Sequence, residues 1–422
     1  MAQEPLVTTL DPADVKARSA MSPAIKAFIC LAAAHAMVDC CALVWSIFKN
    51  LVGLNLARAG LLQFIGMFIA SLMQPVFGAL SDHGMRRRLV VLGIALASCT
   101  MLLGPVSMTG DFMHGPAGYA TMFFVIMFAW LGVSMFHPPA VTLAGETFSG
   151  RRSTAVALFI ACGMTGMASS HLFFSFAFRR LNGHTEVLLI PAAMIVAWVW
   201  WWCRVPQKRC DGSLGLRSMA SQVAQLPRRL FPLWLMQVSV AAHHQGMIFL
   251  MPEFATHRGY DDVFVRGGLF AALIAGSAVM MLPVGHLADR IGRRRVMFLG
   301  LMTSLPLHLL LVLTPRMPAA GCVVILFLIG GFAASMTPVG IAHGQALVPR
   351  QASLITGFLM GFAWAAASPT PWIVGTLAGR PSLGPVGAVA WLAVALLIGC
   401  VSAFFVPGSL EAAPSGRDGS PE

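Results

Sequence analysis

Charged side chains are scarce in this sequence. Asp, Glu, Lys and Arg make up 10% of its 422 residues, whereas an average soluble protein has about 25%. The mean hydropathy is +0.78, and apolar runs of about 20 residues, long enough to cross roughly 30 Å of hydrocarbon, recur along the chain. Tyr occurs only twice, and the alternating pattern of a membrane barrel is missing. The sequence therefore predicts an all-α protein that crosses a membrane many times.

Motifs for catalysis and ATP binding are also missing. The chain has no Walker loop, no His-Glu-x-x-His and no nucleophile elbow. The adjacent Cys40 and Cys41 lack metal-ligand spacing, and none of the nine cysteines falls in a predicted outer loop, so disulfides are not expected. One deep carboxylate and dispersed histidines do not make an enzyme site. We expect no enzyme, no cofactor and no metal.

Membrane topology accounts for the net charge of +12. With the N-terminus placed in the cytoplasm, twenty Lys and Arg residues fall on the inner side and eight on the outer side, as the positive-inside rule requires. Both chain ends are then inside, and no nucleic-acid partner is expected. The eight outer residues are Lys49, Arg58, Arg179, Arg180, Arg258, Arg266, Arg316 and Arg380.

Twelve membrane helices are predicted, in two bundles of six. The polar stretch 204–229 separates residues 24–203 from residues 230–406, and it is expected to be a cytoplasmic loop. Residues 1–23 and 407–422 are expected to be cytoplasmic ends, and residues 1–22 lack the apolar core of a cleavable signal. The predicted helices are 24–48, 60–80, 89–109, 118–145, 153–177, 187–203, 230–251, 267–284, 296–314, 319–345, 353–376 and 385–406.

A short polar hinge occurs once in each half. Gly78-Ala-Leu-Ser-Asp82 leads to three arginines from Arg86, and Gly285-His-Leu-Ala-Asp289 leads to three from Arg293. The offset is constant (285 − 78 = 207, 293 − 86 = 207), although Gly84 comes one place earlier in its copy than Gly292. We expect a cytoplasmic gate, with topology signals as the alternative, formed by Gly78, Asp82, Arg86, Arg87, Gly285, Asp289, Gly292, Arg293 and Arg294.

Ionisable and amide side chains inside the predicted helices gather in helices 1, 4, 7 and 10. These are the first members of four three-helix units, as nested 3+3 inverted repeats would give. Polar groups in a membrane face a bundle interior or a wet cavity, so these helices are expected to line one central path. The residues are His35, Asp39, His137, His243, His244, Gln245, His343 and Gln345. His171 in helix 5 and His308 in helix 9 are exceptions to this pattern.

His35 and Asp39 are four residues apart, on one face of helix 1, where they can touch. An aspartate this deep costs about 2.5–3.5 kcal/mol on insertion scales unless it is paired. Since histidine changes charge near neutral pH, the pair is a candidate for coupling proton movement to substrate movement. A buried pair that only fixes helix 1 against a neighbour is the alternative.

Helix 4 contains Phe136-His137-Pro138-Pro139, in which two prolines beside a histidine can shape a binding site. Imidazoles with few carboxylates favour a small polar or anionic solute. The histidines of helices 7 and 10 are equally well explained as satisfied between packed helices, and neighbouring His243 and His244 cannot share one helix face. Trp45 and Trp364 are candidate stacking surfaces, with packing as the commoner role.

The two hinges resemble those of major facilitator superfamily transporters. His35-x-x-x-Asp39, Gln74-Pro75 before the first hinge, and Phe136-His137-Pro138 resemble the fosmidomycin resistance branch of that superfamily. The resemblance implies export driven by proton antiport, with His35, Asp39 and His137 at the matched positions. Two departures are present: the branch usually has glutamate where this chain has Pro139, and antiporters commonly have Gly-Pro where it has Ser170-His171.

These features together predict a multi-pass protein of the cell membrane, the inner membrane if the source is bacterial. We expect a monomer in the lipid bilayer that exports a small polar or anionic organic compound in exchange for protons. Uptake of a small organic anion, proton-coupled or facilitated, is the alternative. A receptor that does not transport is a further one.

Overall fold

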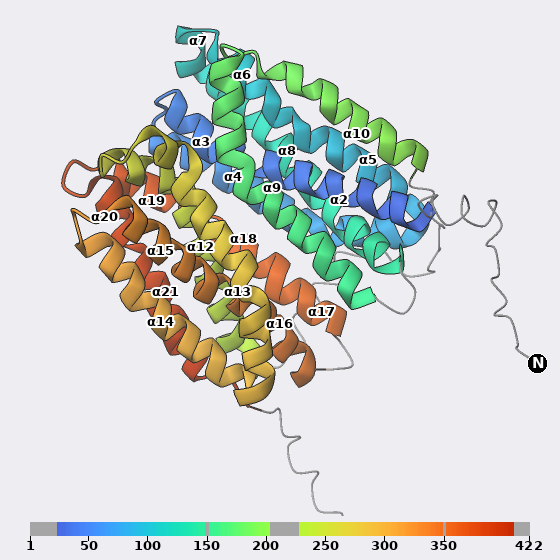
Figure 1. The fold of residues 1–422 in the computed structure, drawn as a ribbon, viewed down its shortest axis with the longest axis vertical. Helices are drawn as coiled ribbons and strands as arrows, with labels where there is room; N and C mark the ends of the chain where they lie inside the picture. The colour runs from blue at the N-terminus through green and yellow to red at the C-terminus, as the bar shows by residue number, and fades with distance from the viewer. Residues whose placement is uncertain (1–22, 148–151, 203–227, 349–351, 409–422) are drawn as a thin grey trace, which may run out of the picture.

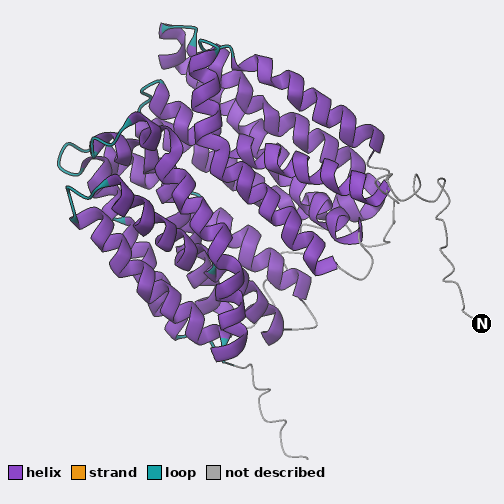
Figure 2. Cartoon of the chain, in the orientation of Figure 1, coloured by secondary structure: helices purple, strands orange, loops and turns teal. Residues whose placement is uncertain are grey.

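The computed structural model describes residues 23–147, 152–202, 228–348 and 352–408. All regular secondary structure in these residues is helical (Figure 2). Each of the twelve predicted spans is mostly helical there, and nine helices of the described part are long and apolar enough to cross a membrane. The predicted tails and most of the central loop lie outside the described residues. The number of crossings and their direction remain predictions.

The N-terminal half contains helices α2 to α10. Its elements are α2 (Pro23–Ala42), α3 (Val44–Leu51), α4 (Leu56–Leu80), α5 (Arg86–Ala97), α6 (Leu103–Ser107), α7 (Asp111–His114), α8 (Pro116–Thr147), α9 (Arg152–Arg180) and α10 (Leu189–Trp202). Helix α8 continues through both of its prolines. The predicted first span is divided at Leu43 into α2 and α3.

The C-terminal half contains α12 to α21. Its elements are α12 (Phe231–His257), α13 (Leu269–Ile291), α14 (Arg293–Leu313), α15 (Ala319–Ile329), α16 (Met336–Leu347), α17 (Ala352–Gly357), α18 (Ala363–Ala367), α19 (Thr370–Ala378), α20 (Gly384–Ala390) and α21 (Leu392–Phe404). In Figure 1 the two halves form two groups of helices side by side.

The two hinges have different turns. Gly84 has φ +92° within a turn over Ser81–Met85, whereas Gly292 has φ +98° and alone separates α13 from α14. A positive φ is readily adopted only by glycine, so each turn is placed where its glycine lies. The one-residue displacement between the two copies in the sequence therefore corresponds to a real difference in backbone.

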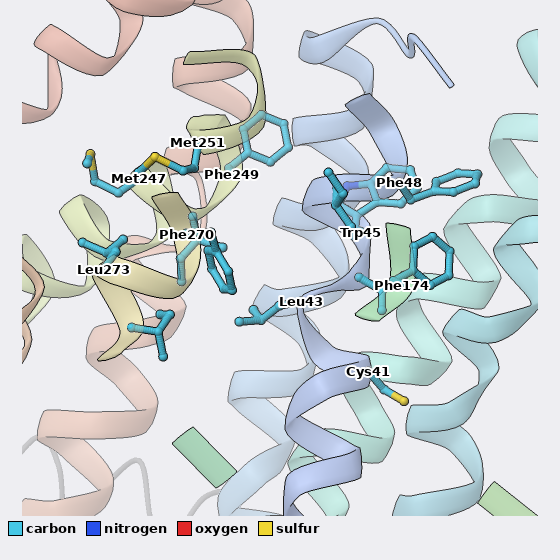
Figure 3. Close-up of a cluster of buried hydrophobic side chains, with 14 of the residues drawn as sticks. Cys41, Leu43, Trp45, Phe48, Phe174, Met247, Phe249, Met251, Phe270 and Leu273 are labelled. Carbon is cyan, nitrogen blue, oxygen red and sulfur yellow. The ribbon is translucent and has the colours of Figure 1, made fainter. Parts of the chain in front are cut away.

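The halves meet closely at the end that is predicted to face outward. An added Cβ on Gly60 of α4 would lie 2.3 Å from the Pro371 carbonyl oxygen of α19. Phe64 of α4 stacks on Trp372 of α19, with ring centroids 6.1 Å apart. Figure 3 shows Leu43 and Phe270, from opposite halves, pointing toward one another within one buried cluster. Apolar packing thus closes the space between the halves at this end.

Helices α2 and α9 approach so closely that only glycine fits between them. A Cβ on Gly166 would lie 1.9 Å from the Ala36 carbonyl oxygen. Overpacking a well-packed core typically costs about 1–3 kcal/mol. We expect Gly166→Val to lower the midpoint of thermal unfolding in detergent by several degrees. Gly357→Ala, where an added Cβ meets nothing within 4 Å, is the control and should leave the midpoint unchanged or raise it. Equal midpoints for both variants would contradict the packing described here.

Candidate functional site

A cavity of about 210 Å³ lies between the two halves. Asp39 and His137 lie in its wall, from α2 and α8. The other lining residues come from the end of α2 and the turn after it, from α4, α8, α9 and α12, and from α18 and the segment that leads into it. They are Ala42, Leu43, Gln63, Met67, Ala70, Ser71, Gln74, Trp130, Val133, Ser134, Met167, Gln245, Ile248, Met360 and Trp364.

His35, Asp39 and His137 form one cluster, which we call the His–Asp–His cluster. Nε2 of His35 lies 3.2 Å from Oδ2 of Asp39, and Nε2 of His137 lies 3.2 Å from Oδ1. The two Nε2 atoms are 3.3 Å apart. His35 and Asp39 are buried, while the His137 side chain is 26% exposed. The cluster therefore meets the cavity through His137 and one edge of Asp39.

Helix α9 closes the buried side of the cluster. An added Cβ on Gly163 would lie 2.4 Å from His35 Nε2 and 2.6 Å from an Asp39 carboxylate oxygen. The His35 ring stacks on Phe159, with centroids 4.0 Å apart. Because a glycine and a flat aromatic ring form this wall, the histidine and the aspartate can be held against the helix backbone with no room for water between them.

The ring nitrogens that face away from Asp39 fix the tautomer of both histidines. Nδ1 of His35 lies 2.8 Å from the Phe159 carbonyl oxygen, and Nδ1 of His137 lies 2.8 Å from the Val133 carbonyl oxygen. A carbonyl oxygen only accepts hydrogen bonds, so each Nδ1 carries a proton. Each neutral ring then turns the lone pair of Nε2 toward Asp39 and toward the other ring.

The cluster therefore lacks a hydrogen-bond donor unless a cation, such as a proton, is added. Two lone pairs and a carboxylate, all acceptors, face one another, and a buried acceptor without a donor costs about 1–3 kcal/mol. One proton on either Nε2 supplies an N–H toward Asp39 and toward the second ring. The cluster then carries charge 0, whereas it carries −1 without that proton.

The three donor atoms lie within 4.8 Å of one another. In the part of the chain that the structure describes, this is the one group of His, Cys, Asp and Glu close enough to hold a metal ion. The histidines contact different carboxylate oxygens, so they do not converge on a single oxygen. A proton on one Nε2 gives an N–H that can donate to Asp39 and to the other ring, which are two of the three contacts.

Two other residues expected in the path lie behind the cavity wall. Phe136 is fully buried, with its ring centroid 5.8 Å from that of His35. Trp45 is 2% exposed and donates from Nε1 to the Ala59 carbonyl oxygen, 3.1 Å away. Neither side chain lines the cavity. Phe136 packs beside His35, and Trp45 ties α3 to α4.

The three polar residues of α12 separate according to helix face. His243 points into the C-terminal half, where its Nε2 lies 3.2 Å from Nδ1 of His308. The His244 ring lies 6.4 Å from that of Trp364, which lines the cavity, and Gln245 lines the cavity directly. Adjacent histidines thus occupy different faces, as their spacing in a helix requires.

The polar residues of α16 lie away from the cavity. Nε2 of His343 donates to the Pro407 carbonyl oxygen at 2.8 Å, and this side chain lines a separate hollow beside Arg293 and Arg294. Nε2 of Gln345 donates to Thr356 Oγ1 at 2.8 Å and so ties α16 to α17. The structure does not bring these two residues to the His–Asp–His cluster.

The hinge arginines bind partners within their own halves. Arg86 pairs with Glu146, at 2.9 Å, and Arg87 donates to the Trp200 carbonyl oxygen. Arg293 pairs with Asp289, at 3.5 Å, and Arg294 donates to the Phe404 carbonyl oxygen. Gly78 lies near Pro138, and an added Cβ on Gly285 would meet nothing within 4 Å. The side chain of Asp82 lies outside the described part, so the cytoplasmic gate remains a prediction.

A buried ion pair between the halves was missed by reasoning from the sequence. Nζ of Lys49 in α3 lies 2.6 Å from Oε2 of Glu253 in α12, with side chains 0% and 9% exposed. Lys49 also lies over the Phe249 ring, 4.3 Å from its centroid. The sequence predicts Lys49 in an outer loop and ends the seventh helix at residue 251, two residues before Glu253. In the structure α12 continues to His257, and this extension contains Glu253, the partner of Lys49.

Gln63 and Trp130 also line the cavity and were not predicted. Each has a counterpart in the other half that the sequence did single out, Gln245 for the amide and Trp364 for the indole. Gln63 and Gln245 are 3% and 2% exposed, and neither side-chain oxygen has a hydrogen-bond partner in the described structure. Gln63 could have been singled out as a polar residue among the apolar neighbours of the predicted second span, 60–80, which is part of α4.

The sequence matches the model of the Major Facilitator Superfamily over residues 27–352. An uncharacterized MFS-type transporter, YfnC of Bacillus subtilis (strain 168), is 23% identical over 352 residues, which cover 81% of this chain and 83% of that protein. The fosmidomycin resistance protein of Escherichia coli (strain K12) is 20% identical over 356 residues, covering 81% and 82%.

Solved transporter structures share the fold. A point mutant of the nucleoside transporter NupG aligns with a TM-score of 0.74 at 13% identity, covering 91% of this chain and 98% of that one. A bacterial homolog of the human lysosomal transporter Spinster, in an inward-facing and unoccupied conformation, aligns with a TM-score of 0.71 at 15% identity, covering 92% and 97%. At these identities the likeness concerns the fold.

The tautomers can be read by ¹⁵N NMR of histidine-labelled protein. We expect Nδ1–H rings at His35 and His137 when they are neutral, because both Nδ1 atoms donate to carbonyl oxygens. His308 is the internal control with the opposite tautomer, since its Nε2 lies 3.0 Å from the Val389 carbonyl oxygen. His35→Gln and His137→Gln assign the signals. Neutral Nε2–H rings at both positions would contradict the cluster as described.

Proposed function

This chain belongs to the Major Facilitator Superfamily, and from that premise we propose that it exports a small polar organic compound in exchange for protons. The family and the transporter neighbours establish a membrane transporter rather than an enzyme. The direction of transport and its coupling to protons are the parts that we propose. The observation that supports them is the His–Asp–His cluster, which needs one added cation and lies in the wall of the cavity between the halves.

Proton binding would change the charge of the cavity wall. With one shared proton the cluster is neutral, and its release leaves a charge of −1 beside the cavity. His35 and His137 are the titratable side chains in contact with Asp39. The Gly163 backbone and the rings of Phe159 and Phe136 also pack around the cluster. A solute that binds only the deprotonated cavity would be exchanged for that proton.

Alternating access requires the outer contacts between the halves to open. Lys49 and Glu253 form part of that closure, together with the packing of α4 on α19. Asp39 and Lys49 lie ten residues apart in α2 and α3, which is about 15 Å along a helix at 1.5 Å per residue. The break at Leu43 lies between them, where Ser170 Oγ donates to the Cys40 carbonyl oxygen at 2.5 Å.

We expect Asp39→Asn to abolish transport driven by a pH gradient in proteoliposomes while substrate exchange across the membrane continues. An amide keeps the size of the side chain but cannot be charged, so the cluster no longer needs the added proton. Asp261→Asn, at an exposed carboxylate outside the cavity, is the control and should behave as the wild type.

Gradient-driven flux that survives in Asp39→Asn would refute the coupling role. The direction of wild-type flux also separates export from uptake. Solute that moves against the proton flow indicates antiport, and solute that moves with it would favour the uptake alternative. Flux indifferent to the gradient would favour facilitated transport, as the departures at Pro139 and at Ser170-His171 would suggest.

Neutralising one member of the Lys49–Glu253 pair should favour opening at the outer end. Removing one partner of a buried ion pair typically costs about 3–5 kcal/mol, whereas replacing both with apolar residues is often neutral. We expect Glu253→Gln to lengthen the distance between spin labels at Thr109→Cys and Arg380→Cys in a background without the native cysteines. The double variant Lys49→Met/Glu253→Leu should restore the shorter distance. Unchanged distances in Glu253→Gln would show that the pair does not hold this end closed.

A further inference from the structure

We propose that the exported compound is an amphipathic amine, that is, an apolar and partly aromatic body carrying a protonated amino group. This inference rests on the proposed function, because it concerns the cavity through which transport would occur. It departs from the small anionic solute that the histidines alone suggested. Three features of the cavity carry it: the hydrogen-bond acceptors in its wall, the charges that line it, and its aromatic and methionine surface.

Two glutamines that line the cavity have side-chain oxygens that lack donors. The side-chain oxygens of Gln63 and Gln245 are buried without a hydrogen-bond partner in the described structure. Nε2 of Gln245 lies 3.4 Å from the Trp364 carbonyl oxygen, which can only accept, so the amide is oriented with its oxygen free. Buried acceptors of this kind are normally satisfied, and a bound ligand with N–H donors satisfies them. An ammonium group supplies three such donors.

The lining is poor in positive charge. Among the described residues that line the cavity there is no Lys or Arg, and the imidazole protons at Nδ1 are already used by helix carbonyls. A carboxylate or phosphonate placed here would lie beside Asp39 without a cationic partner, and burying an unpaired charge is costly. A cation instead faces the cluster in its −1 state.

The remaining wall fits an apolar and aromatic body. Trp130 of α8 and Trp364 of α18 line the cavity from opposite halves, and a cation over a tryptophan face gains about 0.5–2 kcal/mol. Met67, Met167 and Met360 complete this surface. Methionine is flexible and polarisable, so such a wall adapts to differently shaped apolar groups.

The exchange balances in protons and charge. The neutral cluster, holding one shared proton, meets a monovalent ammonium ion and releases that proton to water. The ammonium N–H groups then donate to Asp39 and to the free amide oxygens. One positive charge enters the site as one leaves, so export of a monovalent amine for one proton is electroneutral. The flux should follow the pH gradient and be indifferent to the membrane potential.

The test uses matched compounds and purified wild-type protein in detergent. Benzyl, indolyl-ethyl and naphthyl-methyl bodies are each compared as the primary ammonium, the trimethylammonium and the corresponding carboxylate. Binding is measured by calorimetry in two buffers of different ionisation enthalpy, which also reports protons released. We expect the ammonium form to bind about tenfold or more tightly than the carboxylate, to bind more tightly than the trimethylammonium, and to release about one proton per ligand.

Variants locate the binding in the cavity. Gln245→Leu should weaken ammonium binding severalfold, because it removes an acceptor. Gln237→Leu is the matched control: Gln237 is also a buried amide of α12, bonded to the Thr337 carbonyl oxygen at 2.9 Å, but it does not line the cavity. Binding in Gln237→Leu should equal that of the wild type.

The outcomes separate this inference from the proposed function. Preference for the carboxylates, or no binding by any ammonium compound, overturns the amine class and leaves proton antiport standing. Ammonium binding without proton release supports the amine class but contradicts proton exchange. Equal effects of Gln245→Leu and Gln237→Leu would place the amine outside the cavity and overturn the inference.

Discussion

The His–Asp–His cluster depends on one constraint: the single N–H group of each neutral histidine ring already donates to a helix carbonyl oxygen. Because the carbonyl oxygens of Phe159 and Val133 accept from Nδ1–H, Nε2 of each histidine can only accept, and both face the Asp39 carboxylate, which also only accepts. Helix α9 must come close enough to exclude water, which Gly163 permits. The tight packing of α2 on α9 is therefore a condition for a centre that needs an added cation.

The same stretch of chain carries an ion pair between the halves, at the end that is predicted to face outward. A buried ion pair such as Lys49–Glu253 contributes little net stability, because desolvation offsets much of the attraction between the charges. If the two halves separate and water enters, each charge regains its hydration. A short ion pair can therefore break at a small cost in free energy. Lys49 lies on α3, which follows α2 and Asp39 after the break at Leu43. The His–Asp–His cluster and the Lys49–Glu253 pair are therefore joined by one continuous stretch of chain.

Much of the fold and part of the centre follow from the sequence, for different physical reasons. Span length and apolarity predicted the helices, and the i, i+4 rule placed His35 beside Asp39. Joining His137 to that pair, from another helix 98 residues beyond Asp39 (137 − 39 = 98), follows from packing, which spacing along one helix does not encode. The same limit hid Lys49–Glu253, whose partners lie in different halves. Phe136, Trp45 and His343 show the converse: residue type marked them, but side-chain direction takes them away from the cavity.

The two departures from the antiporter pattern acquire local explanations in this packing. Pro139 stands where the resemblance to the fosmidomycin resistance branch implies a glutamate, and His137, two residues earlier, supplies a second acceptor for a shared proton. Ser170 stands where the resemblance to antiporters implies a glycine, and its Oγ donates to the Cys40 carbonyl oxygen next to the break between α2 and α3. His171 stacks on Phe270 of the other half, with ring centroids 3.8 Å apart, and so adds to the outer closure. This stretch of α9 thus contacts α2, which carries Asp39, on one side and the C-terminal half on the other. Helix α9 therefore links the position of Asp39 to that of the opposite half.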